Sequence, residues 1–186
     1  MKTLILNANP APGSAELNDY LNKLEQKLQT SGEVEICNLA EANIHFCTGC
    51  WSCWLKTPGR CVFRDEMDRI LPKIIAADVL IFATPLVMGF IHSSLKKAMD
   101  RSIPLLLPYI GIYHGECHHY LRYSKSPALA LLVEKEPDTD EEDLEIVTHT
   151  FQRLSLNFRN RLLWVKTTEV DVAKVFEEVM HEINHI

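Results

Sequence analysis

The chain has 186 residues, of which 47% are hydrophobic and 24% are charged, and its formal net charge is −6. This length suffices for a buried core, and we expect a single domain over residues 1–186. The acidic balance and the scattered Lys and Arg residues argue against nucleic acid as a partner. No apolar run reaches the roughly 18 residues that a membrane helix needs, and no signal peptide is recognisable, so we expect a cytoplasmic protein without a membrane partner.

The first half of the chain alternates short apolar runs with longer amphipathic ones. Residues 3–9 predict a buried strand, and residues 17–28 carry leucines at the spacing of one helix face. Ser14 is the expected N-cap of that helix. Residues 33–38 predict a second strand. Residues 78–84 predict a third, whose continuous apolar run is typical of a central parallel strand.

The second half continues this alternation. Residues 128–134 and 162–167 predict the fourth and fifth strands, and an apolar stripe over residues 172–183 predicts a last helix. Thr139 and Glu142 form the expected capping box of the helix between these two strands. The alternation predicts a parallel sheet with helices on both faces.

Two segments depart from the pattern. Pro72 interrupts the helical run of residues 67–77, which we expect to be kinked or divided into two pieces there. Residues 102–123 combine leucines, prolines, glycines and histidines, which predicts a long crossover loop with one apolar face. Its apolar part, residues 103–113, is expected at an interface between copies of the chain, since contiguous exposed apolar patches mark association sites.

Four cysteines follow the second strand within fifteen residues: Cys47, Cys50, Cys53 and Cys61. Gly49 allows the backbone to curl so that these thiols converge. In a reducing compartment, clustered cysteines are more often metal-binding or catalytic than structural. An iron–sulfur cluster, a zinc ion and redox-active thiols without metal all remain open interpretations of this cysteine loop (residues 47–61).

Two strand ends have the character of a ligand site. Ligands of open parallel sheets bind at the carboxyl ends of the strands, where helix N-termini favour a phosphate. Residues 7–14 form a turn-rich connection after the first strand, and residues 84–89 after the third strand are apolar enough to lie against a flat ring. Both are also compatible with plain strand–helix connections, so these residues alone leave phosphate binding open.

In combination these motifs resemble the flavodoxin-like NAD(P)H-dependent FMN reductases. The resemblance rests on the loop after the first strand, on the cysteine run, and on the sequences Asp78-Val-Leu-Ile-Phe-Ala-Thr-Pro85 and Ser94-Leu-Lys-Lys-Ala-Met-Asp-Arg101, and it covers the first two-thirds of the chain. The cysteine spacing is similar to that of the iron–sulfur flavoproteins. The resemblance implies an α/β fold with a doubly wound five-stranded parallel sheet of order 2-1-3-4-5, FMN as cofactor, and a homodimer or homotetramer.

The resemblance also implies which residues bind FMN. The phosphate is expected in the phosphate segment (residues 9–15) and the isoalloxazine against the ring segment (residues 85–89). The implied contacts are Asn9, Pro10, Ala11, Ser14 and Ala15 for the phosphate, and Pro85, Leu86, Val87, Met88 and Gly89 for the ring. Ala11 stands where the family usually has Arg, and Glu16 where it often has a hydroxyl residue. We expect Glu16 to point to solvent, because a carboxylate repels a phosphate.

Further candidate residues follow from the same resemblance. A [4Fe–4S] cluster, if present, is expected to be bound by Cys47, Cys50, Cys53 and Cys61. The histidines in residues 114–119 are poor metal ligands as a set, since adjacent side chains point in different directions. The candidates to hold a quinone-like acceptor beside the flavin are Tyr113, His114, His118 and Tyr123. The plainer interpretation, that these histidines are solvated loop residues, stays open.

The expected function is that of an FMN-dependent oxidoreductase that passes electrons from NAD(P)H to a small acceptor such as a flavin or a quinone. No side chain is required as an acid or a base. One alternative is a non-enzymatic electron carrier or redox sensor, in which the cysteine loop is the working part. Another is a flavodoxin-like binding module that has lost its cofactor, which Ala11 and Glu16 favour.

Overall fold

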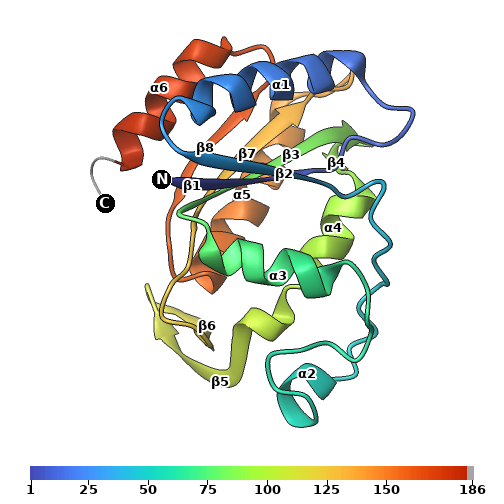
Figure 1. Ribbon diagram of the computed structural model, residues 1–186, viewed down its shortest axis with the longest axis vertical. Coiled ribbons are helices and arrows are strands. Elements are labelled where there is room, and N and C mark those ends of the chain that lie inside the picture. Colours follow the sequence, from blue (N-terminus) through green and yellow to red (C-terminus); the bar gives the residue numbers. More distant parts are fainter. Residues whose placement is uncertain (184–186) are drawn as a thin grey trace.

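Figure 1 shows the computed structural model, which describes residues 1–183. Its central sheet contains five parallel strands: β1 (Lys2–Asn7), β2 (Glu33–Asn38), β3 (Val79–Val87), β7 (Ala128–Glu134) and β8 (Leu162–Thr167). Their order is β2-β1-β3-β7-β8, and β4 (Phe90–Ile91) pairs with β3 in the antiparallel sense. Since β7 and β8 are the fourth and fifth parallel strands, the predicted order 2-1-3-4-5 is confirmed.

Helices cover both faces of the sheet, as predicted. In Figure 1, α1 (Ala15–Gln29) and α6 (Val172–Ile183) lie on one face, and α3 (Met67–Ala76), α4 (Ser93–Asp100) and α5 (Glu141–Asn157) lie on the other. The side chains of β1 alternate between the two cores that result. Leu4 and Leu6 pack on the face of α3 and α5, whereas Ile5 packs under α1. Within the described residues, no helix combines the length and the hydropathy needed to cross a membrane.

Two helices differ in detail from the prediction. Pro72 lies inside α3, which is one continuous helix over Met67–Ala76, so the alternative of two pieces is wrong. Proline removes one backbone hydrogen bond, but the buried face that includes Ile70 and Ile74 holds the helix against the sheet. The capping box of α5 lies one residue later than predicted and is formed by Asp140 and Asp143.

The predicted crossover loop at residues 102–123 is wrong. A short 3₁₀ turn, η1 (Ile103–Leu105), leads into an antiparallel hairpin of β5 (Leu106–Tyr113) and β6 (Glu116–Leu121). His114 and Gly115 both have positive φ (49° and 80°), which is the conformation of a two-residue hairpin turn. Figure 1 places this hairpin beside α2 (Ser52–Leu55), on the side of α3 and α4 that faces away from the sheet.

Candidate functional site

The phosphate segment is shaped by the side chain of Asn9. Its Oδ1 accepts a hydrogen bond from the amide of Ser14 (3.0 Å), and its Nδ2 donates to the carbonyl oxygen of Ser14 (2.7 Å). Gly13 allows the turn to close, because a Cβ there would lie 2.1 Å from the carbonyl oxygen of Pro10. Asn9 is buried, whereas Ala11 at the tip is exposed. The conformation of this segment is therefore fixed by its own residues.

Ser14 joins the phosphate segment to the edge of the sheet. It is the N-cap of α1, as predicted, since its Oγ accepts from the amide of Leu17 (3.1 Å). The same hydroxyl donates to Oε1 of Glu134 (2.5 Å), the last residue of β7. The carboxylate of Glu134 thus lies at the N-terminus of α1, where the helix dipole stabilises an anion. Glu16, in contrast, is exposed, as expected.

A polar cavity of about 640 Å³ opens between the phosphate segment, α1 and β2. Its lining includes five asparagines: Asn7, Asn9, Asn18, Asn22 and Asn38. Two carboxylates, Glu25 and Glu41, also line it. The cavity therefore offers amide donors and acceptors beside the phosphate segment.

The ring segment is the end of β3 and a tight turn, where a loop was expected. Val87 pairs with Phe90, so Met88 and Gly89 form a two-residue turn with φ values of 54° and 71°. The side chain of Met88 is 93% exposed and that of Val87 is 46% exposed. Leu86 is buried in the core. Met88 and Val87 thus present apolar surface to solvent at the carboxyl end of the sheet.

The phosphate and ring segments lie at the same edge of the sheet. The amide of Ala8 donates to the carbonyl oxygen of Ala83 (2.8 Å), so the ends of β1 and β3 are adjacent. Glu134 connects the two segments, since it is the register partner of Pro85 and the acceptor of the Ser14 hydroxyl. The residues that the resemblance assigns to FMN are therefore brought together, and their role in binding stays a prediction.

Carboxylates surround the ring segment. The amide of Gly89 donates to Oε2 of Glu136 (3.2 Å). A Cβ at Gly89 would lie 2.2 Å from Oδ1 of Asp143, so α5 approaches the turn closely. With Glu134 at Ser14, three carboxylates lie around these segments. This edge of the sheet is therefore acidic, and Glu134 already binds the hydroxyl of Ser14.

The four clustered cysteines line one cavity of about 30 Å³ together with Trp51. Gly49 and Trp51 both have left-handed backbone conformations (φ 63° and 58°), so the expected curl is found. All four thiols are free. Within residues 1–183, no three His, Cys, Asp or Glu side chains are close enough to hold a single metal ion. Four thiols around one cavity are nevertheless the donor set of a [4Fe–4S] cluster, which spreads its ligands over four iron atoms.

The cysteines also act on one another electrostatically. Burial raises the pKa of the Cys53 thiol, and the charges of Cys61 and Cys47 raise it further. Hydrogen bonds from Ser52 lower the pKa of the exposed Cys50. The thiols therefore form one interacting group.

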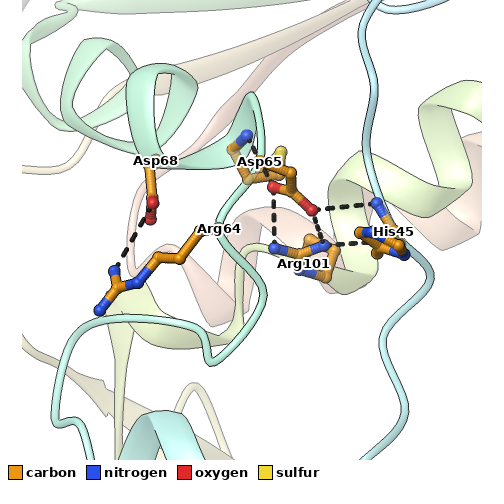
Figure 2. A network of polar contacts seen from close by, with 6 residues as sticks. His45, Arg64, Asp65, Asp68 and Arg101 are labelled. Atoms are coloured by element: carbon orange, nitrogen blue, oxygen red, sulfur yellow. Dashed lines mark hydrogen bonds and ion pairs between the residues drawn. The ribbon is translucent and has the colours of Figure 1, made fainter.

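Figure 2 shows a buried ion pair between Arg101 and Asp65. Arg101 follows α4, and its side chain is 1% exposed, as is that of Asp65. Nη1 and Nη2 of Arg101 donate to the two carboxylate oxygens of Asp65 (2.7 and 3.0 Å), and Nη1 also donates to the carbonyl oxygen of His45 (2.8 Å). Burial alone raises the pKa of Asp65, but the hydrogen bonds from Arg101 and from the amides of His45 and Met67 hold it below its usual value.

The β5–β6 hairpin, which carries Tyr113, His114 and His118, contacts the cysteine loop at the start of β5. Trp54 connects the two parts, since its Nε1 donates to the carbonyl oxygen of Leu106 (2.9 Å) and its ring lies 4.9 Å from that of His119. His118 is buried between Asn157 (2.9 Å) and Glu116 (3.2 Å). Figure 1 shows the hairpin that carries these histidines away from the ring segment of the same chain.

Sequence reasoning missed the residues that connect these parts. Glu134 stands at the end of a predicted strand, and Asp65 belongs to none of the motifs above. Arg101 stood within a recognised motif without a role. The available signal was positional, since Glu134 ends a central strand at the edge where ligands bind.

Comparisons with known proteins agree with this fold. An iron–sulfur flavoprotein of Methanocaldococcus jannaschii is 33% identical over 112 residues, which are 59% of this chain and 55% of that protein. An iron–sulfur flavoprotein of Methanosarcina thermophila is 33% identical over 82 residues, 44% of this chain and 42% of that protein. The chain thus spans about half the length of the curated relatives it matches.

Among solved structures, an NAD(P)H:quinone oxidoreductase from Methanothermobacter marburgensis superimposes with a TM-score of 0.62 at 18% identity, over 97% of this chain and 92% of that chain. An FMN-dependent NADH-azoreductase from Bacillus anthracis, solved in complex with FMN, gives 0.60 at 15% identity, over 99% of this chain and 96% of that chain. The family model of the NADPH-dependent FMN reductases matches residues 1–116. This match covers more than half of the sequence, and the chain belongs to the NADPH-dependent FMN reductase family.

Proposed function

We propose that this protein is an FMN-dependent oxidoreductase that passes electrons from NAD(P)H to a small acceptor such as a quinone or a flavin. The observation that carries the proposal is that the phosphate and ring segments lie together at the carboxyl edge of the sheet. Glu134 contacts both, because it accepts a hydrogen bond from Ser14 and is the register partner of Pro85. The exposed side chains of Val87 and Met88 supply the apolar surface that a flavin ring needs. The family and the solved neighbours support the same reaction class.

In this proposal the protein supplies binding and orientation. A bound flavin accepts a hydride and passes on electrons, which is chemistry that no side chain can replace. The first-turn amides of α1 and the hydroxyl of Ser14 would hold the phosphate, and Glu134 would have to release that hydroxyl. The exposed side chains of Val87 and Met88 would shield the bound ring from water. The acidic edge disfavours an anionic acceptor and favours a neutral one.

The test is an FMN titration combined with steady-state oxidation of NADH and NADPH in the presence of a quinone. Ser14→Glu places a second carboxylate at the N-terminus of α1, and we expect it to abolish FMN binding. Gln26→Glu, at an exposed position in the last turn of the same helix, adds the same charge far from the N-terminus and should leave the affinity unchanged. Equal FMN affinities for the two variants would mean that the phosphate binds elsewhere.

A second function is favoured by the cysteine loop. We propose that its four thiols hold a [4Fe–4S] cluster and serve as an electron carrier or redox sensor, alone or together with the flavin. The convergence of the thiols on one cavity supports this, as do the names of the curated relatives. Iron and sulfide near four per chain after anaerobic reconstitution would support the cluster, and Cys50→Ala should lose both. Iron-free protein with a full flavin content would exclude it.

We also propose a cytoplasmic homodimer or homotetramer. Six free cysteines among the described residues are compatible with a reducing compartment. The exposed apolar side chains of the β5–β6 hairpin supply an association surface.

A further inference from the structure

Arg101 holds the two ends of the cysteine loop together. Its Nη1 donates to the carbonyl oxygen of His45, two residues before Cys47, and both Nη atoms bind Asp65, four residues after Cys61. The amide of His45 also donates to Oδ2 of Asp65 (3.0 Å), so the entry and exit of the loop share one carboxylate. Figure 2 shows these contacts as one closed network.

One N–H of this buried guanidinium has no acceptor. Nε of Arg101 is inaccessible to solvent and has no hydrogen-bond partner within residues 1–183. An unsatisfied buried donor is costly, and it indicates either a missing group or a functional role. The Cys61 thiol is near enough to the guanidinium to interact with it electrostatically. A thiolate accepts hydrogen bonds and is a group of the kind that Nε lacks.

We propose that Arg101 is a positioning residue for the cysteine loop: it joins the two ends of the loop and directs its remaining N–H at the sulfur of Cys61. The joining of the loop ends rests on the contacts alone. The donation to the Cys61 sulfur also rests on the proposed cluster. Asp65 balances the charge of Arg101, so the pair can stay buried while the thiols around the cavity are unloaded. If the thiols bind a cluster, the Nε–H of Arg101 would donate to the Cys61 sulfur and stabilise the negative charge of that thiolate ligand.

The test compares Arg101→Gln and Arg101→Lys in the full chain. Arg64→Gln is the matched control, because Arg64 forms an exposed pair with Asp68 in the same region (Figure 2). Hydrogen exchange of the metal-free proteins reports on the loop ends, and iron and sulfide content and the reduction potential are measured after anaerobic reconstitution. We expect Arg101→Gln to speed amide exchange at residues 45–47 and 61–65 at least tenfold and to lose more than half of the iron.

Arg101→Lys keeps the charge but loses the fork of donors, so it should retain iron with a more negative potential. Arg64→Gln should match the wild type in all measurements. Wild-type exchange, iron and potential in both Arg101 variants would overturn the proposal. So would a globally unfolded Arg101→Lys protein, since the residue would then support the whole core. If the wild type binds no iron but Arg101→Gln still loosens both loop ends, the first role stands and the proposed cluster fails.

Discussion

At the scale of single residues, Glu134 decides how well a phosphate can bind. Its Oε1 accepts a hydrogen bond from Oγ of Ser14 (2.5 Å) at the start of α1. We expect Glu134→Gln to tighten FMN binding about fivefold. The substitution removes the repulsion between the carboxylate and the FMN phosphate at the N-terminus of α1, which is worth roughly 1 kcal/mol. A fluorescence titration measures this, and Glu16→Gln, at an exposed position of the same turn, should change the affinity less. Weaker binding in Glu134→Gln would mean that the carboxylate helps to hold the cofactor.

Met88 combines backbone strain with exposure. A non-glycine residue in the left-handed region is unfavourable by about 1–2 kcal/mol, and the side chain of Met88 makes little packing contact in return, being 93% exposed. Such strain is often retained at functional sites. We expect Met88→Gly to raise the free energy of unfolding by about 0.5 kcal/mol, after the larger entropy of glycine in the unfolded chain is subtracted, and to weaken FMN binding.

His114→Gly is the control for Met88, since His114 occupies the same position in the turn of the other hairpin (φ 49°). It should gain similar stability in urea unfolding without changing the affinity for FMN. Unchanged FMN affinity in Met88→Gly would remove Met88 from the predicted ring contacts.

At the scale of elements, most of the fold follows from hydrophobic periodicity. The five parallel strands and their order were predictable because each strand is a continuous apolar run between helical patterns. The β5–β6 hairpin was not predictable in the same way, because Ile110 and Ile112 are exposed and their alternation does not mark a buried face. The capping box shifted to Asp140 because aspartate at both positions makes the same reciprocal bonds as the expected residues.

The candidate site was predictable only in part. The segments at the ends of β1 and β3 were found because strand ends at this edge bind ligands in parallel sheets. Glu134 and Asp65 were missed because their roles depend on partners 120 and 36 residues away in sequence, which local patterns do not reveal. Long-range pairs of this kind require the fold.

Asp65 connects the cysteine loop to the end of α4 and should affect stability in a pH-dependent manner. Its pKa is lower in the folded state than in the unfolded chain, so it contributes stability above about pH 4 that is lost as the pH falls through the folded-state value. We expect Asp65→Asn to lose about 3 kcal/mol of unfolding free energy at pH 7, because Arg101 is left buried without its counter-charge.

Urea unfolding between pH 3 and pH 7 tests this expectation. The difference between wild type and Asp65→Asn should shrink at the acid end of the series. Asp68→Asn removes the exposed partner of Arg64 and should cost less than about 1 kcal/mol. Equal losses in the two variants would contradict the assignment of Asp65 as a buried structural carboxylate.

At the scale of the whole molecule, exposed apolar side chains gather on the cysteine loop and the hairpin. Ile112 is 72% exposed, Tyr109 67% and Trp51 52%. We expect a homodimer or homotetramer in light scattering at micromolar concentration, and dissociation when Ile110 and Ile112 are both changed to Lys. Ile146→Lys, at an exposed position of α5, should leave the mass unchanged. A monomeric wild type would defeat the association proposal.

The placement of α4 gives the two proposed sites a thermodynamic relation. The helix begins beside the phosphate and ring segments, where Ser94 Oγ donates to the carbonyl oxygen of Ala8 (3.4 Å) and the amide of His92 donates to Thr84 (3.0 Å). It ends at Arg101, about 12 Å further along at the rise of an α-helix. A short rigid helix anchored at both ends transmits displacement, so occupancy of one site should change the affinity of the other.

By reciprocity, the factor by which iron loading changes the dissociation constant of FMN equals the factor by which FMN changes that of the cluster. We expect this common factor to differ from one in the wild type. It should approach one in Arg101→Gln, because the contact of the C-terminal end of α4 with Asp65 is lost. Titrations of each ligand with and without the other measure it. The eight residues of α4 would then couple the two sites, so that iron at the cysteine loop changes the affinity for FMN at the phosphate and ring segments.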